Sequence, residues 1–331
     1  MTDVAIIGAT TWGTTIGRVL SKKGVKVAIL TKTKDRIREL TEEQKRLRLS
    51  DSSIGTILFT NNCSTAFNSV ELVILAVPAQ TVRENVKQIK DYITDNMIVV
   101  SLAKGLESDT CKRMSEVIDD EIDTIRYEHI CVLSGPNLSV EINRNLPATS
   151  VLAAVNGDIA EKTRAALDSP NFTVFTSSDI VGVELCGALK NVLALGAGMI
   201  DGLGLGNNAK AAFITLGWEE VISLGTALGA KQPTFFGLAG LGDLITTCAG
   251  SLSRNHYVGH EVASGRSLVE VRASMSNVAE GIDTTMAAQY LAHKLGVKVP
   301  IITMIYKILF ESLPAIEITN WFKKGLKSEL I

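Results

Sequence analysis

The stretch Val4-Ala5-Ile6-Ile7-Gly8-Ala9-Thr10-Thr11-Trp12-Gly13 decides the fold of this chain. Its first four residues are an apolar run rich in β-branched side chains, which predicts a buried strand. Apolar residues then recur at helical spacing, so a helix follows the glycine turn. Gly8 permits the tight turn, Gly13 permits close packing of helix on strand, and free N–H groups at the helix start, where Thr11 and Trp12 lie, can receive a pyrophosphate. The stretch therefore predicts dinucleotide binding.

Thr10 departs from the fingerprint G-x-G-x-x-G, because it stands where the middle glycine is expected. We expect its side chain either to push the pyrophosphate outward or to require a slightly different turn.

The remainder of the first half alternates strand-like and helical segments, which predicts a mostly parallel sheet covered on both faces. Beyond about residue 178 strand-like runs nearly vanish, and long Ala/Leu-rich helices follow. We therefore expect an α/β Rossmann-like domain over residues 1–178 and an all-α helical domain over residues 179–331. The expected strands are Val25–Leu30, Leu72–Val77, Ile98–Leu102 and Ile130–Leu133, with Ser150–Val155 and Thr173–Thr176 at an edge; the expected helices include Thr81–Tyr92, Cys111–Ile122, Val181–Ile200 and Ala209–Leu228. The densely charged run Thr31–Arg48 is expected to be mostly a solvated surface.

The composition excludes several classes of function. The chain has 331 residues and a net charge of −2, without the basic surplus of a nucleic-acid-binding protein. Its 5 cysteines show no CxxC pattern and its 4 histidines no i,i+4 pair, so no metal site is predicted and a reducing cytoplasm is expected. No uncharged apolar run reaches the roughly 18 residues of a membrane span, and we expect no membrane insertion.

The residues after the second expected strand bear on the choice of cofactor. An NAD site usually places an acid there to hold the ribose 2′-OH, but Lys32 and Lys34 occupy this loop and no acid precedes Asp35. A cation favours a 2′-phosphate. The sequence therefore favours NADP(H), with NAD(H) possible; two solvated lysines are the structural alternative.

Two segments of the second half can carry chemistry. Lys190 lies in the run 184–192, which is otherwise largely apolar; burial lowers the pKa of a lysine, which can then exchange a proton with a hydroxyl or ketone. The run 237–244, Gly-Leu-Ala-Gly-Leu-Gly-Asp-Leu, places Asp243 in a glycine-rich turn, where it could orient Lys190. Ser253, Arg254 and Asn255 offer a hydroxyl, a guanidinium and an amide to an anion such as a phosphate.

These segments resemble the NAD(P)-dependent glycerol-3-phosphate dehydrogenases, and the resemblance extends from Val4 to about Leu295. Gly8, Trp12, Gly13 and Thr14 match the GxGxWGT pattern of the family, and Gly187 to Asn191 match its GALKN segment. The chain departs from the family at Thr10, Leu138 and Ser139, and at Leu216, where the family usually has an arginine.

The resemblance implies roles for individual residues. It implies that Lys190 exchanges the proton, with Lys104 and Asp243 beside it. The implied substrate-binding residues are Lys104, Gly135, Asn137, Lys190, Asp243, Ser253, Arg254 and Asn255, and the implied cofactor-binding residues are Gly8, Thr11, Trp12, Gly13, Lys32, Lys104, Ser139, Arg254, Val278 and Glu280.

The resemblance also implies the reaction. We expect reversible reduction of dihydroxyacetone phosphate to sn-glycerol 3-phosphate, a precursor of glycerophospholipids. A small phosphorylated substrate is the expected partner, and the helical half leaves room for a homodimer. Two alternatives remain: another β-hydroxyacid- or ketopantoate-type reductase, and a non-catalytic NADP(H)-binding protein.

Overall fold

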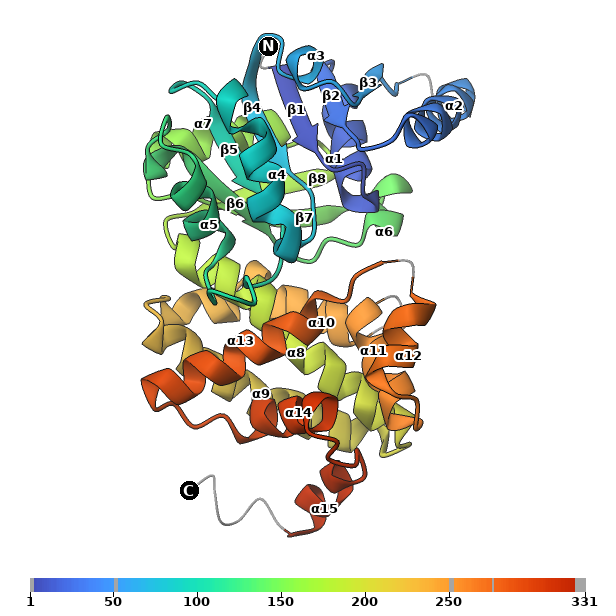
Figure 1. Cartoon of the computed structure of the whole chain (residues 1–331), viewed down its shortest axis with the longest axis vertical. Helices are drawn as coiled ribbons and strands as arrows, with labels where there is room; N and C mark the ends of the chain where they lie inside the picture. Colours follow the sequence, from blue (N-terminus) through green and yellow to red (C-terminus); the bar gives the residue numbers. More distant parts are fainter. Residues whose placement is uncertain (1–2, 51–52, 250–252, 276, 325–331) are drawn as a thin grey trace. The chain divides into compact units, whose positions relative to one another are not determined.

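The computed structural model describes residues 3–50, 53–249, 253–275 and 277–324. The chain divides into two compact units (Figure 1). The sheet unit comprises Met1–Ala103 and Arg113–Val183, and the helical unit comprises Lys104–Lys112 and Glu184–Ile331. The short segment Lys104–Lys112 therefore belongs to the helical unit, although both of its neighbours along the chain belong to the sheet unit.

The sheet unit contains an eight-stranded sheet in the order β3-β2-β1-β4-β5-β6-β7-β8. All neighbouring strands are parallel except β6 and β7, which are antiparallel. The strand order reverses direction between β1 and β4, where open α/β sheets bind ligands. The strands are β1 (Asp3–Ile7), β2 (Val27–Leu30), β3 (Ile57–Thr60), β4 (Val70–Leu75), β5 (Ile98–Ser101), β6 (Ile130–Ser134), β7 (Ala148–Ala153) and β8 (Phe172–Ser177).

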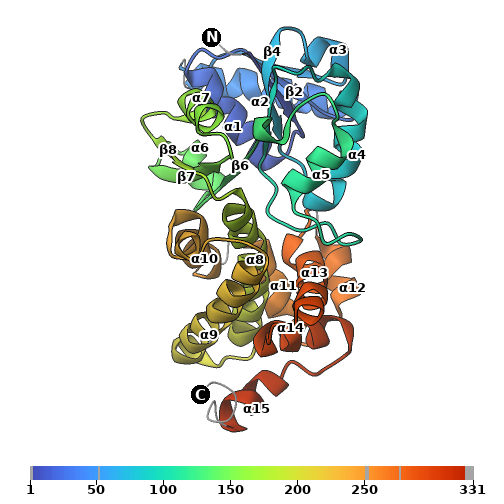
Figure 2. The same cartoon turned by 90° about the vertical axis from the view of Figure 1, so that its left-hand side faces the viewer.

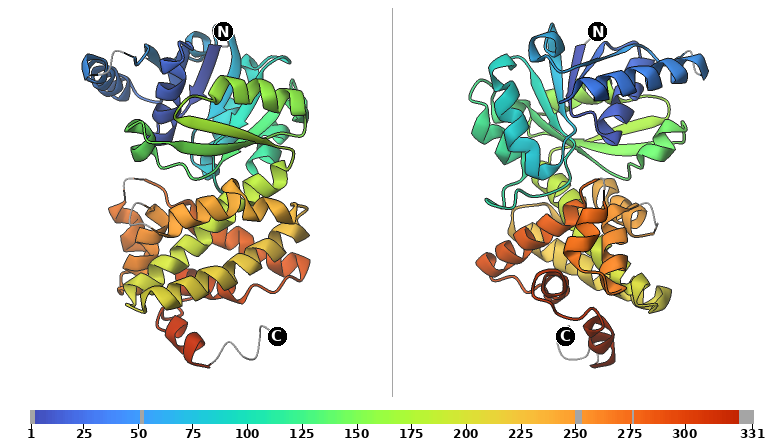
Figure 3. Two further views of the ribbon diagram at one scale, coloured as in Figure 1. Left: turned by 180° about the vertical axis from the view of Figure 1, so that it is seen from behind. Right: turned by 45° about the vertical axis from the view of Figure 1, so that its right-hand side comes forward.

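Both faces of the sheet are buried, which explains why its central strands are continuously apolar. On β1, Val4 and Ile6 pack in one core with α1 and α7, whereas Ala5 and Ile7 pack in a second core with α4 and α5. Figure 2 shows α1 and α7 on one side of the sheet and α4 and α5 on the other, and Figure 3 shows the sheet from two further directions. The helices of this unit are α1 (Thr11–Lys22), α2 (Lys34–Ser50), α3 (Cys63–Ala66), α4 (Val82–Ile89), α5 (Met114–Glu121), α6 (Ser139–Asn143) and α7 (Gly157–Leu167).

The expected fold class is confirmed, with differences in detail. The charged run 31–48 is mostly a helix, α2, which exposes most of its residues. The helix expected from Cys111 begins at Met114, since Cys111 has a positive φ of 58°. The expectation of two edge strands was wrong for β7, because it pairs with both β6 and β8. Strand β3 was not predicted from the sequence.

The helical unit is built around α8 (Ile180–Gly202), which begins in the last residues of the sheet unit. Among the described residues, α8 alone is long and apolar enough to cross a membrane, and 89% of its most apolar window is buried inside the protein, as in a core helix. The other helices are α9 (Gly206–Ala227), α10 (Asp243–Cys248), α11 (Arg254–Ala263), α12 (Leu268–Ser274), α13 (Glu280–Leu295), α14 (Pro300–Phe310) and α15 (Glu317–Lys324), with a 3-10 turn η4 (Gln232–Phe236) and a π-helical turn η5 (Leu238–Gly242).

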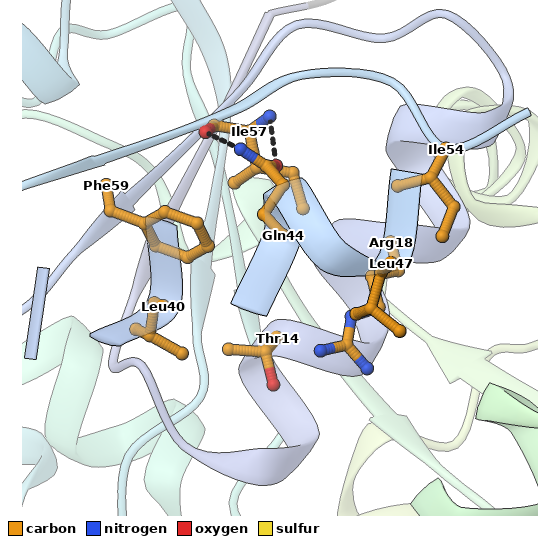
Figure 4. Close-up of a pocket in the computed structure, with 8 residues that line it drawn as sticks. All are labelled: Thr14, Arg18, Leu40, Gln44, Leu47, Ile54, Ile57 and Phe59. Carbon is orange, nitrogen blue, oxygen red and sulfur yellow. Dashed lines mark hydrogen bonds between the residues drawn. The ribbon is translucent and has the colours of Figure 1, made fainter. Parts of the chain in front are cut away.

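A small pocket of about 10 Å³ lies in the sheet unit among α1, α2 and β3 (Figure 4). The side chain of Gln44 closes one side of it, because Gln44 donates to the carbonyl of Ile57 at 3.1 Å and accepts from the N–H of Ile57 at 2.7 Å. None of the site residues named from the sequence lines this pocket, so we place no function there.

Candidate functional site

Lys190 lies near the middle of α8 with only 4% of its surface exposed. Its ammonium group donates to Oδ1 of Asp243 at 2.5 Å and to Oγ1 of Thr247 at 2.5 Å. Burial lowers the pKa of Lys190 from 10.5 to about 8, because the charged form loses hydration. The attraction of Asp243 opposes this effect, and the repulsion of Lys104 reinforces it.

Asp243 serves two lysines at once. Its second oxygen, Oδ2, accepts a hydrogen bond from Lys104 at 2.8 Å, and the carboxylate is only 2% exposed. Asn191, one residue after Lys190, donates to the backbone carbonyl of Lys104 at 2.8 Å and so fixes the segment that carries this lysine. The helical unit therefore contains a cluster in which one buried carboxylate is shared by two ammonium groups, that of the buried Lys190 and that of the partly exposed Lys104.

The backbone around Asp243 differs from the expected glycine-rich turn. The glycine-rich run forms the π-helical turn η5, and Asp243 begins α10. Gly240 is required here because a Cβ atom would lie 2.2 Å from the carbonyl oxygen of Phe235. Thr247, one turn after Asp243, was not singled out from the sequence, although the i,i+4 spacing on α10 could have indicated it.

Cys248 ends α10 close to this cluster. Burial raises the pKa of its thiol to about 12, so it stays protonated at neutral pH. A buried protonated thiol is a poor nucleophile, which leaves Lys190 as the group of the cluster that can exchange a proton near neutral pH.

Ser253, Arg254 and Asn255 lie at the start of α11. The Ser253 hydroxyl accepts the N–H of His256 and caps the helix. Arg254 is exposed, and within the described part of the chain its guanidinium forms no ion pair. Asn255 is buried, and its side-chain oxygen accepts the N–H of Gly281 at 2.9 Å, so it joins α11 to the first turn of α13. Glu280 begins α13, and Val278, two residues earlier, is 43% exposed.

The glycine turn of the sheet unit has the geometry expected of it. Gly8 has a φ of 109°, and a Cβ atom there would lie 2.7 Å from the Val77 side chain. A Cβ atom on Gly13 would lie 2.2 Å from the carbonyl oxygen of Gly8. Trp12 packs edge-on against Phe172, with ring centroids 6.3 Å apart.

Thr10 is the residue that caps α1. Its hydroxyl accepts the N–H of Gly13 at 3.0 Å and donates to the carbonyl of Ala76 at 2.8 Å. The hydroxyl thereby ties the glycine turn to the loop after β4, on the two sides of the point where the strand order reverses. Gly13 cannot offer this N–H to a phosphate, whereas the N–H groups of Thr11 and Trp12 begin the helix and have no acceptor within it.

Basic side chains flank this turn. Lys32 is exposed directly after β2, and Arg36, in the first turn of α2, donates to the carbonyl of Ala9 at 3.4 Å. The sequence analysis missed Arg36, because its approach to the glycine turn depends on how α2 folds back. Arg36 also pairs with Glu39 at 2.7 Å.

The segment after β6 carries the remaining residues named from the sequence. Gly135 has a φ of 147°, which favours glycine. The amide of Asn137 donates to the carbonyl of Thr149 at 2.9 Å, and its oxygen accepts from Ser150 at 3.0 Å, so this side chain holds the turn against β7. Ser139 begins α6.

The fold and these residues define a class. A doubly wound sheet with a glycine turn at its reversal point is typical of nucleotide-binding enzymes, and a buried lysine of lowered pKa is typical of proton transfer. The described residues contain no group of three or more His, Cys, Asp or Glu side chains that could hold a metal ion.

Comparison with known proteins identifies the family. Family models described as the N-terminus and the C-terminus of NAD-dependent glycerol-3-phosphate dehydrogenase match residues 3–160 and 179–320. Glycerol-3-phosphate dehydrogenase [NAD(P)+] of Dehalococcoides mccartyi strain BAV1 is 45% identical over 315 residues, which cover 94% of this chain and 88% of that protein. The corresponding protein of Geobacter sp. strain M21 is 38% identical and covers 98% of both chains. The crystal structure of glycerol-3-phosphate dehydrogenase from Coxiella burnetii is similar with a TM-score of 0.89 and 31% identity, covering 98% of this chain and 99% of that one. The chain belongs to the NAD-dependent glycerol-3-phosphate dehydrogenase family.

Proposed function

We propose that this protein catalyses the reversible, NAD(P)H-dependent reduction of dihydroxyacetone phosphate to sn-glycerol 3-phosphate. The observation that carries the proposal is the cluster in which Lys190 and Lys104 share the buried Asp243. Family membership supports the same reaction, because the curated relatives are named for it.

Lys190 donates the proton that completes the reduction. Its ammonium has a pKa lowered to about 8, so near neutral pH it is mostly protonated and still gives up its proton readily. In the reverse direction the neutral amine takes the proton from the hydroxyl group of glycerol 3-phosphate. When bound, the nicotinamide supplies or accepts the hydride.

Asp243 and Lys104 hold the proton donor and the substrate. Asp243 fixes the ammonium of Lys190 from one oxygen and that of Lys104 from the other, and the partly exposed Lys104 can donate a further hydrogen bond to a substrate oxygen. Gly135 and Asn137 are proposed to bind substrate through the turn after β6.

Ser253, Arg254 and Asn255 are proposed to bind the substrate phosphate. Arg254 supplies the charge, because its exposed guanidinium can form two parallel hydrogen bonds to phosphate oxygens. The side-chain oxygen of Asn255 is engaged with Gly281, which leaves the amide N–H groups of Asn255 for the phosphate.

The residues around the glycine turn fit a dinucleotide. Gly8, Thr11, Trp12 and Gly13 are proposed to form its pyrophosphate site, with the N–H groups of Thr11 and Trp12 as donors. Lys32 and Arg36 favour NADPH over NADH, since both can approach a 2′-phosphate from the loop and helix that follow β2. Further contacts to the cofactor are proposed from Lys104, Ser139, Arg254, Val278 and Glu280.

We also propose the wider setting of the enzyme. Residues 1–178 are the cofactor-binding domain and residues 179–331 the substrate and catalytic domain. The protein acts in the cytoplasm as a homodimer and supplies glycerophospholipid synthesis.

The experiment that tests the reaction follows NADPH absorbance with dihydroxyacetone phosphate. We expect turnover that depends on the phosphate group, with unphosphorylated dihydroxyacetone a far poorer substrate, and slower turnover with NADH. Lys190→Met should abolish turnover but leave NADPH binding, whereas Lys307→Met, which removes an exposed lysine from α14, should change neither. NADPH binding by the wild type without turnover would support the non-catalytic alternative instead.

A second comparison tests the phosphate site. Arg254→Ala should raise the KM for dihydroxyacetone phosphate by roughly ten- to a hundredfold, because a charge-assisted hydrogen bond is lost, and should leave the KM for dihydroxyacetone nearly unchanged. Arg272→Ala removes an arginine that pairs with Asp283 at 2.8 Å and serves as the control. Equal effects on both substrates would remove the phosphate assignment.

A further inference from the structure

Asp201, in the last turn of α8, joins three helices of the helical unit. Its carboxylate accepts hydrogen bonds from Lys210 of α9 at 2.9 and 3.0 Å. It also contacts Nε2 of His256 of α11 at 2.7 Å. The three side chains are 12–29% exposed, so the cluster is shielded from solvent more than an ordinary surface ion pair.

The position of Asp201 along α8 is unfavourable by itself. A negative charge in the last turn of a helix is repelled by the negative end of the helix dipole, and Lys210 in the first turns of α9 faces the opposite repulsion. The ion pair between them opposes both effects. Lys210 also neutralises Asp201, so this carboxylate does not repel an anion bound at the start of α11.

Helices α8 and α11 also pack with their backbones in close contact. A Cβ atom on Gly198 would lie 2.0 Å from the carbonyl oxygen of His256, and one on Gly259 would lie 1.9 Å from that of Leu195. The glycines fix how closely the helices approach. The bond between Asp201 and His256 adds a directional contact that fixes where along α8 the start of α11 lies.

This contact bears on the substrate, because His256 directly follows Arg254 and Asn255. Lys190 lies about three turns before Asp201 on the same helix. One helix therefore carries both the proton donor and the anchor of the phosphate-binding residues. The distance from the reacting carbon to the phosphate is fixed in the substrate, so the enzyme must hold these two groups at a matching distance.

We propose that Asp201 is a positioning residue that sets Arg254 and Asn255 at the correct distance from Lys190 through its bond to His256. This inference rests on the proposed function and deepens it.

The test compares Asp201→Asn with Glu261→Gln. Glu261 pairs with Arg266 at 2.7 Å beyond the other end of α11, so its substitution removes an ion pair from the same helix far from the phosphate-binding residues. We expect Asp201→Asn to raise the KM for dihydroxyacetone phosphate roughly tenfold or more. The KM for unphosphorylated dihydroxyacetone should change less than about twofold, as should every value for Glu261→Gln, and the Kd for NADPH, measured by fluorescence, should rise less than the KM for dihydroxyacetone phosphate.

Two further variants test separately the contacts that Asp201 makes with His256 and with Lys210. His256→Phe keeps a ring of similar shape but loses the contact to Asp201, and it should reproduce the rise in KM. Lys210→Met should have a smaller effect. The proposal is overturned if His256→Phe matches the wild type while Lys210→Met raises the KM strongly, because Lys210 would then bind the phosphate itself.

Other outcomes are equally decisive. If Asp201→Asn raises the KM for both substrates equally and weakens NADPH binding, the residue has only a general structural role and the proposal fails. A wild-type enzyme that shows no preference for the phosphorylated ketone would instead refute the proposed function, so the two failures are distinguishable.

Discussion

The pH dependence of the reaction should report the state of Lys190. The fall in its pKa from 10.5 to about 8 means that the site as a whole, with burial as the largest cause, disfavours the ammonium form by about 3 kcal/mol relative to the neutral amine. Oxidation of glycerol 3-phosphate requires the neutral amine, so kcat/KM should rise with pH and level off above about 8. Reduction of dihydroxyacetone phosphate requires the ammonium, so its kcat/KM should fall through the same pH range.

Two substitutions should move this midpoint in opposite directions. Asp243→Asn keeps the shape of the side chain but removes the negative charge that favours the ammonium, so the pKa of Lys190 should fall below about 8. An opposite charge at hydrogen-bonding distance typically shifts a pKa by about one to three pH units, which is the expected size of the fall. Lys104→Met removes a repelling positive charge, and the pKa should rise.

The assay is the initial rate of glycerol 3-phosphate oxidation at low substrate concentration over pH 6 to 10. Asp283→Asn is the control, because it removes a carboxylate of the same unit that pairs with Arg272. Residual activity of Asp243→Asn will be small, but only the midpoint is needed. A wild-type midpoint near 10, or a shift of both variants in the same direction, would refute the account of Lys190 given above.

Three other substitutions test the fold and the cofactor site. The carboxylate of Glu220 accepts the first N–H groups of α14, and burial raises its pKa from 4.5 to about 7. The folded state therefore binds this proton more tightly than the unfolded state does. As a result, the wild type should lose about 3 kcal/mol of stability between pH 4.5 and 8. In urea unfolding Glu220→Gln should lack this loss. If the free energies of unfolding of the wild type and of Glu220→Gln fell in parallel with pH, Glu220 would not be the cause of the loss. Gly259→Ala places a methyl group 1.9 Å from the carbonyl oxygen of Leu195 and should destabilise the helical unit by about 3 kcal/mol in thermal unfolding. Gly157→Ala, where the new methyl group has no neighbour within 4 Å, is the control and should leave the stability unchanged. Thr10→Val should weaken NADPH binding in fluorescence titrations and should destabilise α1 by about 1 kcal/mol, because the helix cap is lost. Thr10→Ser keeps the hydroxyl and should match the wild type. Equal NADPH binding by Thr10→Val and Thr10→Ser would mean that the hydroxyl has no part in the cofactor site.

The architecture could be predicted from the sequence where burial is extensive. Central strands such as β4 and β5 are covered on both faces and therefore appear as continuous apolar runs. Strand β3 lies at the edge of the sheet and is only partly buried, and α2 is dominated by charged residues, so neither gives a clear apolar signal. The place of β7 between β6 and β8 depends on pairing between distant segments, which local patterns do not encode.

The same difference between local sequence patterns and contacts of distant segments applies to the site. Lys190 could be recognised because a single cation in an apolar helix must be paired or neutral, and its burial and lowered pKa agree with that reasoning. The partners that surround it are contacts between residues far apart in the sequence, such as the bond from Lys190 to Thr247. Asp201 and His256 were missed for this reason, since each is an ordinary surface residue until the helices are packed together.

The charges around Lys190 explain why one carboxylate should serve two lysines. With both lysines protonated, the ammonium groups of Lys104 and Lys190 repel each other across Asp243, and this repulsion helps to lower the pKa of Lys190. Proton donation by Lys190 in the proposed reduction removes that repulsion, while Lys104 stays paired with Asp243. Part of the cost of burying the ammonium is therefore released as the product hydroxyl forms. A second carboxylate beside Lys190 would stabilise its ammonium and raise its pKa, and the lysine would then be a weaker proton donor.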